Sequence, residues 1–167
     1  EHLVGFSFDR TGYWRGGSYG YFLYGLHSSL PFFDAYRRYC GFDLFRCKGS
    51  RLEKAIEYDV YTLVPMGIGH TPFEDNSGIY KIDPMIIVKL MSEYKSGIEA
   101  YHFMRVFGPK GDRTLSIAGS TAGGSYGRGN PLSIVWWEDI PELDPEKELP
   151  QDKLFERGAV IMRSGWE

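Results

Sequence analysis

The 167-residue sequence has little of what would identify a function class directly. Its two cysteines, Cys40 and Cys47, are too few for a disulfide scaffold. It contains no run of eighteen or more apolar residues, so no membrane span is predicted. It also lacks an excess of basic residues, because 19 Lys and Arg against 22 Asp and Glu give a net charge of −3. This balance argues against a nucleic-acid-binding protein.

Several catalytic and ligand-binding motifs are also missing. There is no Gly-x-Ser-x-Gly sequence, and the glycine-rich stretch 119–129 is not followed by the Lys-Ser/Thr pair of a phosphate-binding loop. The histidines His2, His27, His70 and His102 are scattered singly, and no Cys-x-x-Cys sequence occurs. We therefore expect no metal site whose ligands are close in sequence, and no cofactor.

Aromatic residues are abundant instead. The chain has 12 Tyr, 11 Phe and 4 Trp, so 16 % of its residues are aromatic, and each buried phenol needs a polar partner or water. With 43 % apolar and 25 % charged residues, the composition is otherwise that of a globular protein.

Apolar residues at spacings of three and four predict a mainly α-helical chain. One helix is expected over 19–39, either kinked at Pro31 or split there into two helices. Further helices are expected from a capping box at 50–53, from Asp83-Pro84, from a second capping box at 96–99 up to about Phe107, and over 131–137.

The connections between these helices differ in character. Residues 65–80 form a long segment of the kind that often lines a functional site, and 109–130 are predicted to be an exposed loop. Residues 139–153 are acidic and contain prolines, which is typical of a linker, and a strand is expected after them.

This order predicts helical hairpins stacked around an axis and joined to a β domain, because no strands alternate with the helices. The expected division is a helical segment over 1–138, a linker over 139–153, and the first strand of a β domain over 154–167. A lone terminal strand is not a stable unit. We therefore expect the chain to be a segment of a longer protein; the alternative is a complete small protein whose last strand pairs back.

A group of tyrosines at and after the pair Gly16-Gly17 is a candidate site. It comprises Tyr13, Tyr19, Tyr21 and Tyr24. Helical spacing places Tyr21 and Tyr24 on one face and Tyr19 at the start of the helix. Most of the four are expected to pack in the core, and one could face a cleft.

A histidine in the long connection is a second candidate. His70 lies between Gly69 and Thr71, and Glu74 and Asp75 follow closely. It could line a site or lie on the surface.

Four segments, in the same order, resemble the heparinase II/III-type polysaccharide lyases. They are the glycine- and tyrosine-rich stretch 14–25, the stretch 30–45 that ends in Gly-Phe-Asp-Leu-Phe, the loop 65–75, and the terminal stretch 155–166. The resemblance implies that 1–138 are part of an (α/α) toroid and that 154–167 begin an antiparallel β-sandwich.

The family reaction is β-elimination at a uronic acid, with a tyrosine and one or two histidines as acid and base. The resemblance assigns proton transfer to Tyr19, with Tyr21 and Tyr24 as fallback assignments. It also implies that Trp14, Arg15 and His70 bind substrate, although Arg15 stands where many relatives carry Glu. An arginine there could pair with a substrate carboxylate.

The resemblance further implies an acidic polysaccharide substrate, such as a glycosaminoglycan or alginate, and a periplasmic or secreted parent protein. No nucleic-acid or membrane partner is expected. The other histidines of the family pattern would lie outside residues 1–167. We therefore expect the parent to be a lyase and the isolated chain to be inactive.

Two other functions compete with this expectation. The first is a carbohydrate-binding helical module without catalysis, since aromatic faces suit a glycan. The second is a toroid glycosidase, which needs two carboxylates at a defined separation. The candidate carboxylates are Glu74, Asp75, Asp34 and Asp59.

Overall fold

The described part of the chain is mainly helical. The computed structural model describes residues 7–16, 19–64, 69–71, 82–108 and 131–166. Its helices are α2 (Tyr19–Cys40), the 3-10 turn η1 (Leu52–Lys54), α3 (Ala55–Thr62), α4 (Pro84–Tyr94), α5 (Gly97–Phe107), α7 (Pro131–Val135) and α8 (Pro145–Glu148). Its strands are β1 (Lys153–Leu154) and β2 (Val160–Ile161).

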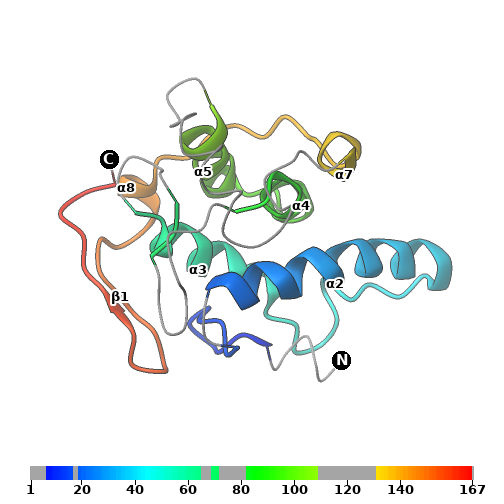
Figure 1. The fold of residues 1–167 in the computed structure, drawn as a ribbon, viewed down its shortest axis with the longest axis horizontal. Coiled ribbons are helices and arrows are strands. Elements are labelled where there is room, and N and C mark those ends of the chain that lie inside the picture. Colours follow the sequence, from blue (N-terminus) through cyan, green and yellow to red (C-terminus); the bar gives the residue numbers. More distant parts are fainter. Residues whose placement is uncertain (1–6, 17–18, 65–68, 72–81, 109–130, 167) are drawn as a thin grey trace.

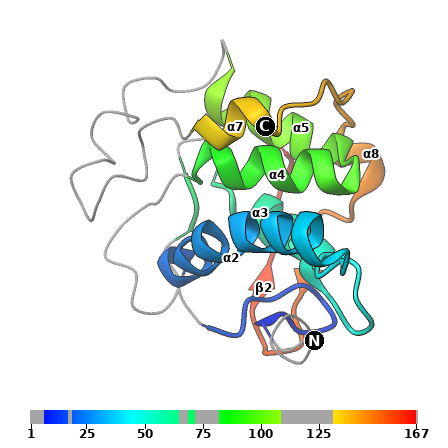
Figure 2. The same cartoon turned by 90° about the vertical axis from the view of Figure 1, so that its right-hand side faces the viewer.

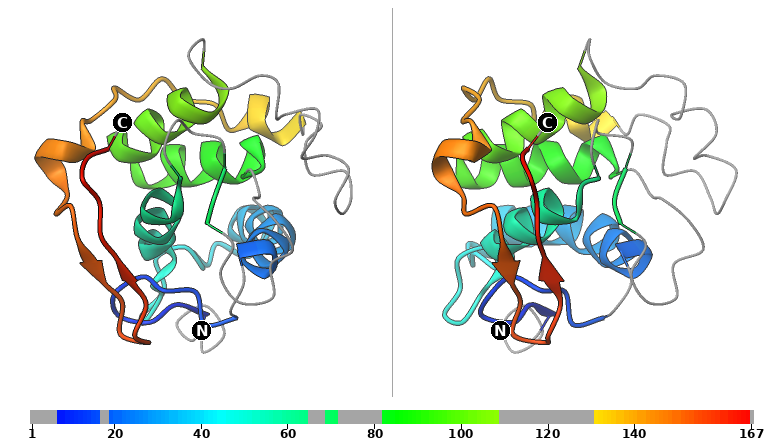
Figure 3. Two further views of the ribbon diagram at one scale, coloured as in Figure 1. Left: turned by 60° about the vertical axis from the view of Figure 1, so that its left-hand side comes forward. Right: turned by 90° about the vertical axis from the view of Figure 1, so that its left-hand side faces the viewer.

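The helices form two layers, which Figures 1 and 2 show from two sides. Helices α4 and α5 lie together in one layer, with α7 beside α4. Helices α2 and α3 form the other, where α2 packs against α4 and α3 packs against α5. Strands β1 and β2, the C-terminal hairpin, run along one edge beside the N-terminal segment (Figure 3). The site described below lies where α2, α3 and α5 meet.

Helix α2 continues through Pro31, so the alternative of two helices divided at Pro31 is wrong. Its buried side is the predicted apolar stripe, which includes Phe22, Leu26 and Leu30. Gly41 ends the helix with φ +70°, a left-handed conformation that glycine adopts without strain, and its N–H bonds to the carbonyl of Arg37 at 2.9 Å.

The start of α4 confirms its sequence signal. The carboxylate of Asp83 accepts a hydrogen bond from the N–H of Met85 at 2.8 Å, and Pro84 occupies the first turn. These residues are therefore the N-cap and first helical residue that the sequence predicted.

The two predicted capping boxes do not form in full. Ser96 caps α5 by accepting from the N–H of Glu99 at 3.1 Å, but the Glu99 side chain contacts His102 instead of returning to Ser96. The box at 50–53 is wrong, because the Ser50 hydroxyl donates to the carbonyl of Phe45 and accepts from the N–H of Leu52 at 3.4 Å rather than from Glu53, and the N-cap residue Arg51 makes no side-chain cap.

The core between the layers and the C-terminal hairpin is rich in aromatic rings. Phe155 from the hairpin packs against Tyr13, Tyr58 and Tyr61, with ring centroids 5.6 to 6.3 Å apart. Tyr61 also donates its hydroxyl to the carbonyl of Pro150 at 2.6 Å. These contacts fix α3, because residues from both ends of the described chain pack against it.

The predicted terminal strand is present as β2, which pairs antiparallel with β1. The stretch predicted as a linker contains α8 and contacts the helices through a hydrogen bond from the N–H of Leu143 to the carbonyl of Gly97. Within the described ranges, no helix is long and apolar enough to cross a lipid bilayer. The predicted loop 109–130 and most of 65–80 lie outside the described residues.

Candidate functional site

Tyr19 lies in the first turn of α2 with its ring fully buried. Its hydroxyl donates a hydrogen bond to Oδ1 of Asp59. Its ring stacks on the imidazole of His70, with centroids 4.0 Å apart and planes 9° from parallel. Because aromatic neighbours and a carboxylate both constrain it, the phenol is held in a defined orientation.

Asp59 comes from α3, in which every residue except Glu57 is buried. A carboxylate inside such a helix has no access to water, so it must be compensated by protein groups. Tyr19 supplies one of these groups, and two histidines from other parts of the chain supply the rest.

His70 reaches Asp59 because the chain pairs back on the end of α3. The N–H of Val64 bonds to the carbonyl of Gly69, and the N–H of Thr71 bonds to the carbonyl of Thr62, each at 2.8 Å. This antiparallel bridge places His70 opposite Leu63, immediately beyond the helix that carries Asp59. Backbone pairing, rather than the side chain itself, sets the position of the imidazole.

His102 and Glu99 come from α5 and lie on one helix face because they are three residues apart. Both are fully buried, and Nδ1 of His102 lies 3.4 Å from Oε2 of Glu99. Since α5 packs against α3, this face points at Asp59.

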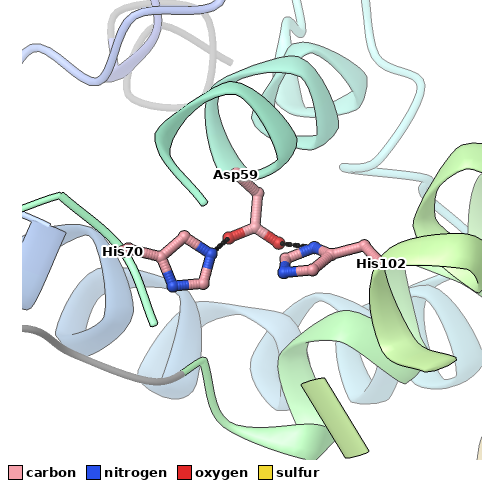
Figure 4. Close-up of side chains that lie close together, drawn as sticks. All are labelled: Asp59, His70 and His102. Carbon is pink, nitrogen blue, oxygen red and sulfur yellow. Dashed lines mark ion pairs between the residues drawn. The ribbon is translucent and has the colours of Figure 1, made fainter. Parts of the chain in front are cut away.

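The two histidines flank the Asp59 carboxylate from opposite sides (Figure 4). Nε2 of His70 lies 3.1 Å from Oδ1, and Nδ1 of His102 lies 2.9 Å from Oδ2. We refer to Tyr19, Asp59, His70, Glu99 and His102 as the Asp59 cluster.

Burial and neighbouring charges lower the pKa of Asp59 and raise the pKa values of His102 and Glu99. Burial alone would raise the pKa of Asp59, but His102 and His70 outweigh it and hold that pKa well below its usual range. Burial alone would lower the pKa of His102, yet Asp59 and Glu99 raise it to about 10. Burial and the Asp59 charge raise the pKa of Glu99 to about 8.

The same surroundings shift the pKa of the Tyr19 phenol. Burial and the neighbouring Asp59 carboxylate raise the pKa of Tyr19 well above 10. The hydroxyl is therefore protonated near neutral pH, in agreement with its role as the hydrogen-bond donor to Asp59.

The sequence-predicted residues are only partly brought together. Tyr19 and His70 are in direct contact. The fallback residues Tyr21 and Tyr24 are 55 % and 62 % exposed, on the side of α2 away from the core.

Trp14 and Arg15 lie apart from the phenol. The Trp14 ring packs on Phe8 and Phe22, at 5.3 and 6.1 Å, and borders a pocket of about 420 Å³ next to α2. Arg15 is half-buried, and its N–H donates to the carbonyl of Ser7 at 2.9 Å. The substrate contacts proposed for the two residues stay predictions.

The carboxylates proposed for a glycosidase do not form one group among the described residues. Asp59 bonds to Tyr19, whereas Asp34 belongs to a different ionic group around Lys89. Glu74 and Asp75 lie outside the described residues.

Sequence reasoning missed Glu99 and His102, and considered Asp59 only as a glycosidase acid. The sequence interpretation placed Glu99 in a capping box and treated His102 as one of four scattered histidines. A signal did exist, because Asp59 interrupts an apolar helix, and Glu99 and His102 share a face of another apolar helix. The expectation of no metal site considered only ligands close in sequence, whereas Asp59, His70 and His102 are far apart along the chain.

Comparisons with protein-family models, with characterised proteins and with solved structures found no match to this chain.

Proposed function

We propose that this chain is a segment of a polysaccharide lyase that cleaves a uronic-acid-containing polysaccharide by β-elimination, with Tyr19 as a proton-transfer residue. The helices would then be part of an (α/α) toroid, and the C-terminal hairpin would begin a β-sandwich. The contact of Tyr19 with Asp59 and His70 is the observation that carries the proposal. Tyr19 is also the tyrosine that the lyase resemblance assigns to proton transfer.

In β-elimination, a base removes the proton from C5 of the uronic acid. The electron pair of that bond forms the C4–C5 double bond, the C4–O bond breaks, and the leaving glycosidic oxygen takes up a proton. Tyr19 is suited to the last step because its hydroxyl carries a proton, which would pass to the leaving oxygen once the hydroxyl turns from Asp59 to the substrate. Asp59 orients that hydroxyl, and His70 holds the ring. The base would lie outside this chain, as the sequence resemblance implies.

The proposal requires a conformational change that exposes Tyr19. Tyr19 is 0 % exposed, so the substrate reaches its hydroxyl only if the active protein opens around the ring. The activity test below decides whether it does.

The test is ultraviolet absorbance of the unsaturated product, measured for this chain and for a longer parent protein. The substrates are alginate, heparin, heparan sulfate, chondroitin and hyaluronan. The parent is expected to be active and the isolated chain inactive. Tyr19→Phe should lower the parent's kcat by about 10²-fold or more. Tyr21→Phe is the matched control, because Tyr21 is exposed on the same helix. An active parent that tolerates Tyr19→Phe would contradict the proposal.

A second candidate function is carbohydrate binding without catalysis, and a specific surface favours it. Five exposed aromatic residues lie along α2: Tyr21, Tyr24, Phe32, Tyr36 and Tyr39. Their helical spacing places them on one side over a length of about 27 Å. Polysaccharide binding by the parent, without unsaturated product from any of the five substrates, would favour this function over the lyase.

A further inference from the structure

The Asp59 cluster contains a set of donor atoms that fits a metal ion. Asp59, His70 and His102 each offer one ligand atom, and these three atoms lie within 4.8 Å of one another. All three side chains are fully buried. They come from α3, from the bridge beyond it and from α5, so the tertiary fold assembles them (Figure 4).

The distances within the set are close to those of a tetrahedral zinc site. Bonds of about 2.0 to 2.1 Å to imidazole nitrogen and carboxylate oxygen place neighbouring ligand atoms about 3.3 Å apart at the corners of a tetrahedron. The observed separations are 3.1 Å from His70 to Oδ1 of Asp59 and 2.9 Å from His102 to Oδ2, and the whole set of three ligand atoms lies within 4.8 Å. To admit the ion, the two imidazoles, which now flank the carboxylate from opposite sides, would have to turn toward one another.

A second carboxylate is available at the edge of the set. Oε2 of Glu99 lies 3.4 Å from the same His102 nitrogen that faces Asp59. Oε1 of Glu99 is buried and accepts no hydrogen bond from any residue in the described ranges. A buried acceptor of this kind is costly unless it is compensated, and metal ligation would compensate it.

Ion binding would also change the protonation of the cluster. The pKa of His102 is about 10 and that of Glu99 about 8, so the ion would displace both protons; one divalent cation would then neutralise the two carboxylates while the imidazoles are neutral, the form in which histidine binds a metal. Tyr19 supports the arrangement from outside, because it donates to Asp59 and stacks on His70. Such outer contacts orient the ligands of metal sites.

We propose that Asp59, His70 and His102 bind one divalent transition-metal ion, with Glu99 as the fourth ligand. Zn²⁺ fits this set best, because it favours four-coordinate sites of imidazole and carboxylate ligands. The proposal does not depend on the lyase reaction, because it concerns binding alone.

The experiment uses the full chain, stripped with a chelator and titrated with Co²⁺ as a spectroscopic probe. The expected result is one Co²⁺ per chain, with visible absorption bands that an equivalent of Zn²⁺ abolishes. Asp59→Asn and His70→Gln should weaken binding by at least about 100-fold. His27→Gln is the matched control, because His27 is a partly exposed histidine that pairs with Asp83 at 3.6 Å. It should bind as the unaltered chain does.

Two results would overturn the proposal. Absence of Co²⁺ and Zn²⁺ binding by the unaltered chain would leave the cluster as a hydrogen-bonded network only. Undiminished binding by the folded Asp59→Asn variant would place the ion elsewhere. If that variant does not fold, X-ray absorption of the zinc-loaded unaltered chain decides, because the site requires scattering from two imidazoles. None of these measurements uses a substrate, so they are separate from the test of lyase activity.

Discussion

At the residue scale, the buried Glu93 lies within a second group of charges, which includes partly exposed arginines. It accepts hydrogen bonds from Arg37 and Arg46 and pairs with Lys89 at 3.0 Å, and Lys89 in turn pairs with Asp34 at 2.9 Å. Burial alone would raise the pKa of Glu93, but the bonds from Arg37, Arg46 and Lys89 lower it to about 2. The folded state therefore binds this proton less readily than the unfolded state does.

This shift predicts an acid-sensitive contribution to stability. Because the folded pKa lies below the unfolded one, the contribution is fully present above about pH 4.5 and is lost as the pH falls toward about 2. Glu93→Gln should lower the free energy of unfolding at pH 7 by about 2 kcal/mol, and the difference from the unaltered chain should shrink across that window. Urea denaturation at a series of pH values measures it.

The control for this prediction is Glu142→Gln, because Glu142 is exposed. It should have little effect at any pH. A Glu93→Gln deficit that stays constant from pH 7 to pH 3 would show that the pairing of the carboxylate is not its source.

The sequence identified Tyr19 and His70 as candidates one by one, but it did not predict that the residues of the Asp59 cluster lie together. Tyr19 was singled out by its place after a glycine pair, and His70 by its place in a long connection. Their contact depends on the bridge between Leu63 and His70, which carries no periodic signal. The partnership of Asp59 with His102 depends on the packing of α3 against α5, and that packing is a property of the tertiary structure.

At the element scale, the start of α5 depends on the absence of a side chain. A Cβ added at Gly97 would lie 2.5 Å from Cγ of Leu143 and 2.6 Å from the carbonyl oxygen of Pro141. The second contact involves backbone, so a rotamer change cannot relieve it. Glycine is therefore required for the segment 139–143 to pass so close to the helix.

Gly97→Ala should destabilise the chain by about 1 to 3 kcal/mol, although alanine is the better helix former. The midpoint of urea denaturation measures this effect. Gly165→Ala is the matched control, because its added Cβ would meet no atom closer than 3.7 Å. If Gly97→Ala instead raised stability, helix propensity would outweigh the steric contact and the packing described here would be wrong.

Element boundaries were predicted well where a local signal set them. The Asp83-Pro84 start of α4 is such a case, because cap chemistry acts over a few residues. The box at 50–53 failed because Ser50 bonds to Phe45 instead, a choice that the motif does not encode.

At the scale of the whole molecule, Arg163 joins the C-terminal hairpin region to α3. Its guanidinium donates to the carbonyls of Val60, Tyr61 and Leu63, at 3.3 and 2.7 Å for the first two. These carbonyls lie at and just beyond the end of α3, where backbone donors are scarce, although that of Val60 also accepts from the N–H of Leu63 at 3.4 Å. The helix that carries Asp59 is thus completed by a residue from a distant part of the chain.

Arg163→Met should lower the free energy of unfolding by about 1.5 to 3 kcal/mol, because charged hydrogen bonds to buried carbonyls are lost while the aliphatic volume is largely kept. Urea denaturation tests this, and amide exchange near the end of α3 should become faster. Arg157→Met is the control, because Arg157 is exposed. Equal effects of the two substitutions would refute the special role of Arg163.

The same contact has a consequence for biosynthesis. Val60 and Arg163 are 103 positions apart, so a ribosome completes α3 long before it adds the residue that caps it. Until then, water must satisfy the last carbonyls of the helix, and Asp59 lacks part of its final surroundings. The end of α3 is therefore among the last features of this region to mature on a nascent chain, and a product truncated before Arg163 would lack these three hydrogen bonds.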